Sequence, residues 1–277
     1  AESLFFIYLI TRLLLFSSRK WHAFCLIKDM KLYIISNRLP VKATGQNGSF
    51  TFLRSEGGLA TGLDSLRTSC EKHWIGWPGI CVDNEDDKQA IGVQLEEMNF
   101  HPVFLSDAHV KDYYEGYSNS TIWPLCHYFF AYTLYKDCFW QAYKEVNCRF
   151  CDEICRLVRP GDKVWVQDYQ LMLLPGMLRE RYPDLSIGYF HHIPFPSYEL
   201  FRILPERAEI LKGLLGADFI GFHIHDYMRH FISTVERVLH INIKLDEVQI
   251  GNRIVRIDAL PMGINYELYH AASSLSL

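Results

Sequence analysis

Residues 163–196 constrain the fold of this chain more than any other stretch, because they read as a strand, a helix and a second strand in succession. The two β-rich runs are 164–166 and 187–190, and the apolar residues at helical spacing between them are Leu171, Leu174, Met177 and Leu178. Strands joined through a helix pair in parallel, so this unit predicts a parallel sheet. We therefore expect an α/β, Rossmann-like fold, with a mainly parallel sheet and helices on both faces.

Polar side chains follow each of these two strands at the point where the strand ends. Asp168 comes shortly after the first run, and His191 and His192 come directly after the second. In open α/β sheets the ligand crevice lies outside the carboxyl ends of the strands. Pro194 and Pro196 stiffen the second loop, because each fixes its own φ. The pattern places Asp168 and His192 beside a substrate.

An earlier strand is expected to end at the same edge of the sheet. Residues 32–35 form a β-branched and aromatic run that is typical of a buried strand, and Arg38 follows it closely. Arg38 is therefore predicted at the edge that Asp168 and His192 also occupy.

Gly57 and Gly58 precede an amphipathic segment that reads as a helix. Free backbone N–H groups at a helix start attract anions, and glycine lets a phosphate come close. The signal is weak by itself, because a Gly-Gly pair before a helix is more often a turn. The G-x-G-x-x-G and P-loop fingerprints of dinucleotide and ATP sites are absent from the sequence.

An aromatic-rich segment, 113–124, follows a helix for which we expect Asp107 to be the N-cap and which should end near residue 114. We expect this segment to be an irregular connection. Sugar sites use aromatic faces and tyrosine hydroxyls to order a polyhydroxylated ligand, and few surface loops carry so many rings. For Trp123, core packing is an equally strong explanation. Trp77 is a further ring near the end of a predicted strand, 74–79.

The rest of the pattern alternates strands and helices within one α/β domain that begins at Met30. Further strands are expected at 102–105, 218–222 and 259–264, helices at 139–158, 204–215 and 226–239, hairpins at 41–52 and 242–257, and a solvated acidic loop at 84–88. The sequence has neither an internal repeat nor a long low-complexity linker.

Composition and charge exclude several classes of protein. The chain has 277 residues, is 49% hydrophobic and carries a formal net charge of -4, which argues against a general nucleic-acid or acidic-membrane binder. The apolar run at 5–16 is too short to span a bilayer comfortably. We expect residues 1–29 to lie outside the fold.

Three of the eight cysteines, Cys148, Cys151 and Cys155, lie close together in the sequence. Their spacing is that of one helix face, and no fourth ligand stands nearby, so buried thiols are expected rather than a metal site. No disulfide pattern is present, and we therefore expect a cytoplasmic protein.

Six motifs follow one another along the chain after Met30. They are ISNRLP at 35–40, EGGLATGL at 56–63, YYEGYSNSTIWPLCHY at 113–128, WVQDYQLMLLP at 165–175, HHIPFPSYELFRILP at 191–205 and LPMGIN at 260–265. In this order they resemble the trehalose-6-phosphate synthase family. The resemblance implies a GT-B glycosyltransferase that transfers glucose from UDP-glucose to glucose 6-phosphate with retention, without a metal or another cofactor.

The resemblance also implies a domain organisation. Residues 30–265 match the N-terminal, acceptor-binding domain of the family, and 266–277 then form a truncated tail with the donor-binding domain missing. In the family the cations that neutralise the donor diphosphate lie in that second domain, so the chain alone is expected to be catalytically silent. The resemblance leaves a further phosphatase domain, the preferred nucleotide and a homo-oligomer open.

Acceptor-side roles can be carried over residue by residue. Arg38 matches the arginine that holds the acceptor phosphate. Trp77, Tyr114 and Trp123 match aromatic residues of the acceptor pocket. Asp168 matches an acidic residue that meets the acceptor sugar, and the resemblance implies a catalytic role for it.

Donor-side roles are implied for three residues. Gly58, with its neighbour Gly57, matches the glycine beside the donor diphosphate, and His192 matches a catalytic histidine near the transferring glucose. Gln167 and Gln170 depart from the family motif, in which many relatives have histidine. Both glutamines keep hydrogen-bonding capacity, so tuning is expected rather than loss.

Two alternatives stay open. An Asp–His pair also suggests a hydrolase, although neither a serine or cysteine elbow nor a glycosidase carboxylate pair is evident in the sequence. The other alternative is a non-catalytic sugar-phosphate-binding or regulatory relative of the same family.

Overall fold

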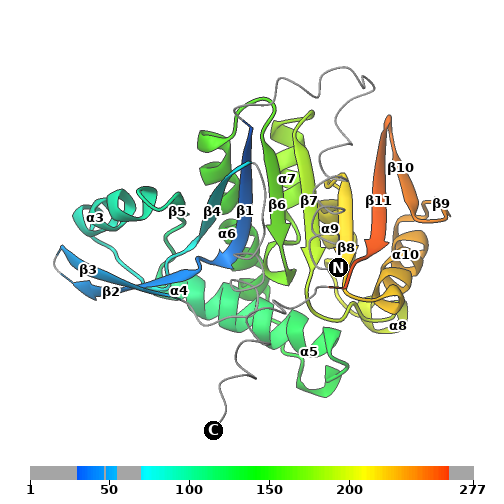
Figure 1. Cartoon of the computed structure of the whole chain (residues 1–277). Helices are drawn as coiled ribbons and strands as arrows, with labels where there is room; N and C mark the ends of the chain where they lie inside the picture. The colour runs from blue at the N-terminus through cyan, green and yellow to red at the C-terminus, as the bar shows by residue number, and fades with distance from the viewer. Residues whose placement is uncertain (1–29, 47, 55–69, 262–277) are drawn as a thin grey trace, which may run out of the picture.

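The computed structural model describes residues 30–46, 48–54 and 70–261, and its centre is a nine-stranded sheet (Figure 1). The strands of this sheet are β1 (Lys31–Arg38), β4 (Glu71–Trp77), β5 (Phe100–Pro102), β6 (Lys163–Gln167), β7 (Ser186–His191), β8 (Phe219–Phe222), β9 (Ile243–Lys244), β10 (Glu247–Ile250) and β11 (Arg253–Ala259). Their order is β5-β4-β1-β6-β7-β8-β11-β10-β9. Pairing is parallel from β5 to β11 and antiparallel around β10, so the predicted mainly parallel sheet is confirmed.

The chain changes direction across the sheet between β1 and β6. From β1 it runs outward to β4 and β5, and it then returns to the other side of β1, where β6, β7 and β8 follow in order. β1 and β6 are neighbours, with Ile35 opposite Val166. Ligands of open α/β sheets bind at such a switch point, outside the carboxyl ends of the strands. Arg38 and Asp168 stand at these two ends.

Helices cover both faces of the sheet, as the sequence predicts. Tyr33 and Ile35 of β1 pack into one core cluster and Leu32 and Ile34 into the other, because side chains alternate along a strand. Among the helices that contribute to the first cluster are α6 (Asp137–Leu157), α7 (Leu174–Arg181), α8 (Tyr198–Phe201), α9 (Arg207–Leu214) and α10 (His225–Leu239). The second cluster receives side chains from α3 (Glu85–Glu96).

Two hairpins lie at the positions that the turn residues predict. β2 (Val41–Gln46) pairs with β3 (Ser49–Arg54) as a separate ribbon, and β10 pairs with β11. The prediction of a separate strand that starts at Ala259 is wrong. β11 already continues through Ala259, which lies opposite Phe222 of β8, and residues from 262 onward lie outside the described part of the chain.

The aromatic-rich segment is helical, so its prediction as an irregular connection is wrong. It consists of α4 (Asp107–His109), the π-helical η1 (Val110–Ile122) and α5 (Trp123–Cys126). Ser106, not Asp107, is the N-cap, and its hydroxyl accepts the backbone N–H of His109. At Gly116 a Cβ would lie 2.7 Å from the Phe139 ring, so glycine permits close packing of η1 on α6. In Figure 1 this helix lies across the ends to which the strand arrows point.

Three smaller predictions also need correction. The acidic segment 84–88 begins α3 instead of forming a loop, because the Asn84 side chain accepts the backbone N–H of Asp86 and acidic residues suit a helix start. The strand expected at 102–105 is β5, which already ends at Pro102. Of the cysteines on α6, Cys151 is buried, but Cys148 is exposed.

Neither a membrane span nor a metal-ligand cluster is found in the described residues. No helix among them combines the length and the apolar character that crossing a membrane requires. Within the same ranges, no three His, Cys, Asp or Glu side chains are grouped so that they could hold a metal ion.

Gly216→Ala is expected to destabilise the fold by about 1–3 kcal/mol. A Cβ at Gly216 would lie 2.4 Å from the backbone nitrogen of Gly176 and 2.5 Å from the carbonyl carbon of Pro175, where α7 meets the end of α9. Backbone atoms cannot move aside without shifting a helix. Gly92→Ala in α3 is the matched control, because a Cβ there meets nothing within 4 Å, and it should stabilise by about 0.4–1 kcal/mol. Urea unfolding measures both, and equal free energies for the two variants would contradict the close approach.

Acid is expected to destabilise the fold through the stacked pair His73 and His101. The Nδ1 of His73 lies 2.9 Å from the Nε2 of His101, and its Nε2 lies 3.0 Å from a carboxylate oxygen of Glu71. Burial lowers the pKa of His101 to about 4, helped by His73 and Lys31, and burial also lowers the pKa of His73. Both rings are therefore neutral at physiological pH.

The pH dependence follows from these lowered pKa values. Below the ordinary pKa of 6.5 the unfolded chain binds more protons than the folded one, so stability falls as the pH drops from 6.5 towards about 4. His101→Gln cannot take up the proton but keeps an N–H donor for His73. As the pH falls from 7 to 5, we expect the free energy of unfolding of this variant to rise by about 1–2 kcal/mol relative to that of the unaltered protein. Urea unfolding measures both values. A difference that stays constant over this range would refute the role of His101.

Candidate active site

Arg38, Trp77 and Tyr114 form one cluster at the carboxyl ends of β1 and β4. The guanidinium carbon of Arg38 lies 4.7 Å from the ring centroid of Trp77 and 5.3 Å from that of Tyr114. Both distances allow cation–π attraction. Arg38 is exposed, and among the described residues it forms no ion pair. Its N–H groups can therefore meet an anion at this edge.

The backbone pairing and one buried hydrogen bond set this cluster. Arg38 lies opposite Trp77 in the register of β1 with β4. The hydroxyl of Tyr113 donates to the Oδ1 of buried Asn37 at 2.9 Å, which fixes η1 against the end of β1. Because Tyr114 is the next residue in η1, this bond also determines where its ring lies.

Asp168 follows β6 in a backbone conformation that is uncommon for residues other than glycine, with φ 70° and ψ 172°. Its Oδ1 accepts the backbone N–H groups of Tyr169 at 2.9 Å and of His192 at 3.1 Å. Burial raises the pKa of Asp168 to about 7, against the lowering effect of the backbone N–H groups of Tyr169, His192 and Ile193. A perturbed pKa together with an unusual backbone is typical of a functional site.

His192 is held by two consecutive residues at the end of β6. Asp168 accepts its backbone N–H, and the ring Nε2 lies 2.8 Å from the Oε1 of Gln167. Burial lowers the pKa of His192 to about 3, with smaller contributions from His223 and His191. The ring of His192 is therefore neutral at physiological pH.

Hydrogen bonds join the loop that carries Asp168 to the neighbouring helices. The hydroxyl of Tyr169 donates to the Oδ1 of Asn119 in η1 at 2.9 Å. The buried hydroxyl of Tyr143 in α6 donates to the carbonyl oxygen of Tyr169 at 2.7 Å. The helix η1 is therefore bonded both to the end of β1 and to the loop after β6, and it holds the Arg38 cluster and Asp168 at one edge of the sheet.

Trp123 is not a core residue, and among the described residues its ring contacts are with His127 and Phe129. Its side chain is 39% exposed, and its ring stacks on His127 with centroids 4.0 Å apart. With Asn119, Phe129 and Tyr132 it lines a hollow of about 380 Å³. Core packing is therefore wrong for Trp123, and its place in a sugar site stays a prediction.

Gly57 and Gly58, the predicted donor-side glycines, lie outside the described residues. Their predicted contact with a diphosphate therefore stays a prediction.

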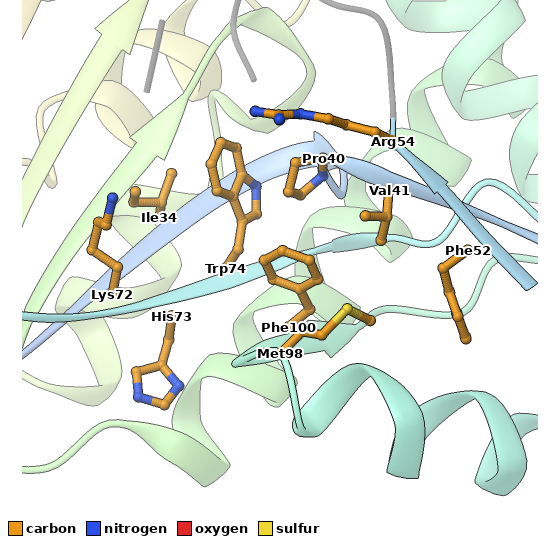
Figure 2. A pocket seen from close by; sticks show the side chains of 10 residues that line it. All are labelled: Ile34, Pro40, Val41, Phe52, Arg54, Lys72, His73, Trp74, Met98 and Phe100. Atoms are coloured by element: carbon orange, nitrogen blue, oxygen red, sulfur yellow. The ribbon is translucent and has the colours of Figure 1, made fainter. Parts of the chain in front are cut away.

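A second hollow, of about 470 Å³, lies between the start of β4 and the β2–β3 ribbon (Figure 2). It is lined by Ile34, Pro40, Val41, Phe52, Arg54, Lys72, His73, Trp74, Met98 and Phe100. None of the predicted site residues is among them. The hollow therefore adds nothing to the site at the carboxyl edge.

Two residues near His192 were missed as site residues. Gln167 contacts its ring directly, and the ring of His223, which follows β8, lies edge-on to it at 5.4 Å between centroids. Both stand at strand ends, so the same strand-end rule that selected His192 would have found them.

Comparison with known proteins gives the family. Residues 30–276 match the model of glycosyltransferase family 20. The 56 kDa subunit of the UDP-forming alpha,alpha-trehalose-phosphate synthase from Kluyveromyces lactis is 45% identical over 243 residues, which are 85% of this chain and 50% of that protein. The corresponding subunit from Saccharomyces cerevisiae is 41% identical over 245 residues, covering 86% of this chain and 50% of that protein.

Solved structures agree with this assignment. The N-terminal domain of Candida albicans trehalose-6-phosphate phosphatase superposes with a TM-score of 0.75 at 31% identity, covering 89% of this chain and 51% of that one. A UDP-forming trehalose-phosphate synthase from Burkholderia xenovorans gives a TM-score of 0.71 at 29% identity, covering 88% and 51%. The chain thus spans about half the length of the relatives that it matches. With its Rossmann-like sheet and its six motifs in order, the chain belongs to glycosyltransferase family 20.

Proposed function

We propose that this domain binds glucose 6-phosphate as the acceptor in a retaining transfer of glucose from UDP-glucose, which yields trehalose 6-phosphate. The observation that carries the proposal is the guanidinium of Arg38, which faces Trp77 and Tyr114 at the switch point of the sheet. The names of the relatives agree with this reaction, since they are UDP-forming trehalose-phosphate synthases.

A phosphate ester suits the Arg38 cluster for a geometric reason. A planar guanidinium can donate two parallel N–H bonds to phosphate oxygens, and the neighbouring rings of Trp77 and Tyr114 limit the orientations of the guanidinium. Trp77 is buried beneath the guanidinium, but the ring of Tyr114 is only partly buried and offers an apolar face to the C–H side of a hexose. One small cluster can therefore hold both parts of a sugar phosphate.

Asp168 is proposed to meet the acceptor sugar, and His192 the sugar that is transferred. Asp168 has a pKa of about 7, so near neutral pH it can accept or donate a hydrogen bond to a hydroxyl group. His192 stays neutral and adds no positive charge beside an oxocarbenium-like transition state. In this scheme the acceptor hydroxyl attacks from the face that the leaving phosphate occupies, and positioning and electrostatics carry the catalysis.

Isothermal titration calorimetry tests this proposal with glucose 6-phosphate and UDP-glucose, separately and together. We expect the chain to bind glucose 6-phosphate more tightly than glucose, and each substrate to strengthen or leave unchanged the binding of the other. Equal affinities for glucose and glucose 6-phosphate would contradict the proposed acceptor site.

One observation favours a second candidate, a non-catalytic sugar-phosphate-binding relative. The Candida albicans domain with this fold is the N-terminal domain of a phosphatase. A product assay separates the two candidates, because a binding relative would hold glucose 6-phosphate but release no UDP in any protein that contains this domain.

A further inference from the structure

Gln167 is fully buried at the end of β6, directly before Asp168. Its side-chain amide makes two contacts. The amide nitrogen lies 3.5 Å from the carbonyl oxygen of Trp165, and the amide oxygen lies 2.8 Å from the Nε2 of His192.

The surroundings fix which way this amide points. The carbonyl oxygen of Trp165 can only accept a hydrogen bond, so the amide nitrogen of Gln167 must face it. A reversed amide would set two acceptor oxygens against each other in a buried place, which is costly. The amide oxygen therefore faces His192, and the Nε2 of that ring must carry the proton and donate it.

We propose that Gln167 is a positioning residue that holds His192 with its proton on Nε2 and a lone pair on Nδ1, so that the ligand group at this nitrogen must donate a hydrogen bond, as a sugar hydroxyl does. Naming that hydroxyl as one of the donor glucose rests on the proposed function. The tautomer itself does not, because it follows from contacts within the chain.

Packing around His192 limits the rotation of its ring. The centroid of Phe190 lies 4.7 Å away and that of His223 lies 5.4 Å away, while Asp168 holds the backbone N–H. Among the described residues, the hydrogen bonds of His192 go through its backbone N–H and its Nε2, and none reaches its Nδ1. The lone pair on that nitrogen would repel a phosphate oxygen and attract a sugar hydroxyl. A sugar phosphate or nucleotide sugar is thereby oriented with its phosphate away from His192.

Long-range ¹H–¹⁵N NMR of the histidine rings tests the proposal in the complete chain without any ligand. In the unaltered protein we expect the Nδ1 of His192 to resonate as an unprotonated nitrogen and its Nε2 as a protonated one, with the assignment made from the signals lost in His192→Gln. The opposite pattern would overturn the proposal, whatever the variants do.

Two substitutions of Gln167 and one control substitution show whether Gln167 determines the tautomer of His192. Gln167→Met has a similar shape but no acceptor, and we expect both His192 nitrogens to shift towards averaged positions. Gln167→Glu keeps an acceptor and should retain the protonated Nε2, and Gln170→Met, a change at a neighbouring buried glutamine, should leave the His192 signals in place. An unchanged tautomer in Gln167→Met would overturn the role of Gln167.

Adding UDP-glucose to the same NMR experiment distinguishes a failure of this proposal from a failure of the proposed function. Adding UDP-glucose is expected to shift the Nδ1 signal of His192 while Nε2 stays protonated. If UDP-glucose causes no shift but the variants behave as expected, the tautomer assignment is supported, and the result counts against the proposed function alone. A shift that deprotonates Nε2 would overturn the requirement for a donating hydroxyl.

Discussion

Arg38→Ala is expected to weaken glucose 6-phosphate binding on the order of a hundredfold, while glucose binding changes by less than about threefold. The reason is that two charge-assisted hydrogen bonds to the phosphate are lost together, and the described residues place no second cation on Trp77 or Tyr114. Titration calorimetry of both ligands gives the two ratios. Equal losses for both ligands would mean that Arg38 is structural.

Two further variants control this prediction. Arg38→Lys keeps the charge but not the fork, so its affinity should fall between those of the unaltered protein and Arg38→Ala. Arg202→Ala removes an arginine that also faces a ring, that of Tyr198 at 5.7 Å, and it should leave glucose 6-phosphate binding unchanged. A comparable loss in Arg202→Ala would point to a general effect of net charge.

Asp168→Asn is expected to stabilise the protein at alkaline pH and to weaken acceptor binding. The pKa of Asp168 is about 7 in the folded protein and 3.8 in an ordinary setting, so the folded state binds the proton more tightly. The contribution of Asp168 to the free energy of unfolding is therefore largest at low pH, and it is lost as the pH rises from about 4 to 7. An uncharged amide avoids this loss, which corresponds to about 2–4 kcal/mol at pH 8. Asparagine also tolerates a positive φ.

Urea unfolding at pH 5 and pH 8 measures this effect. The stability difference between Asp168→Asn and the unaltered protein should grow with pH in favour of the variant. Asp218→Asn is the control that should destabilise the protein, because it breaks the ion pair with Arg179 at 2.7 Å. If Asp168→Asn is less stable at pH 8 than at pH 5 relative to the unaltered protein, the raised pKa is wrong.

The strand ends were predictable because they depend on local pattern. Buried parallel strands are short apolar runs, and the residues that follow them lie at one edge of the sheet, which is how Arg38, Asp168 and His192 were selected. Asn84 caps α3, and this capping signal is present in the sequence, although the charge of 84–88 favours a solvated loop. Such errors come from weighing charge above capping.

The aromatic segment could not be predicted in the same way. Gly116, Ser118, Asn119 and Thr121 are weak helix formers, and tertiary contacts hold η1 in place instead. Gly116 packs against Phe139, and the hydroxyl of Thr121 donates to the carbonyl oxygen of Leu134. The meeting of Tyr114 with Arg38 depends on the rotation of this helix, which these contacts determine together with the hydrogen bond from Tyr113 to Asn37.

The pairing of Gln167 with His192 shows a second limit of sequence reasoning. Adjacent strands can be inferred from the alternation of strands and helices, but the distance between two side chains depends on register. The register of β6 with β7 sets Gln167 opposite Phe190, and the turn after β7 then carries the His192 ring back to the glutamine. The contact between Gln167 and the His192 ring therefore does not follow from residue spacing.

A crystal structure of the chain with glucose 6-phosphate tests the central claim most directly. We predict that the phosphate lies against the guanidinium of Arg38, beside Trp77, and that the hexose lies between the ring of Tyr114 and the carboxyl group of Asp168. A phosphate bound elsewhere, for example in the hollow beside Lys72 that Figure 2 shows, would contradict the account.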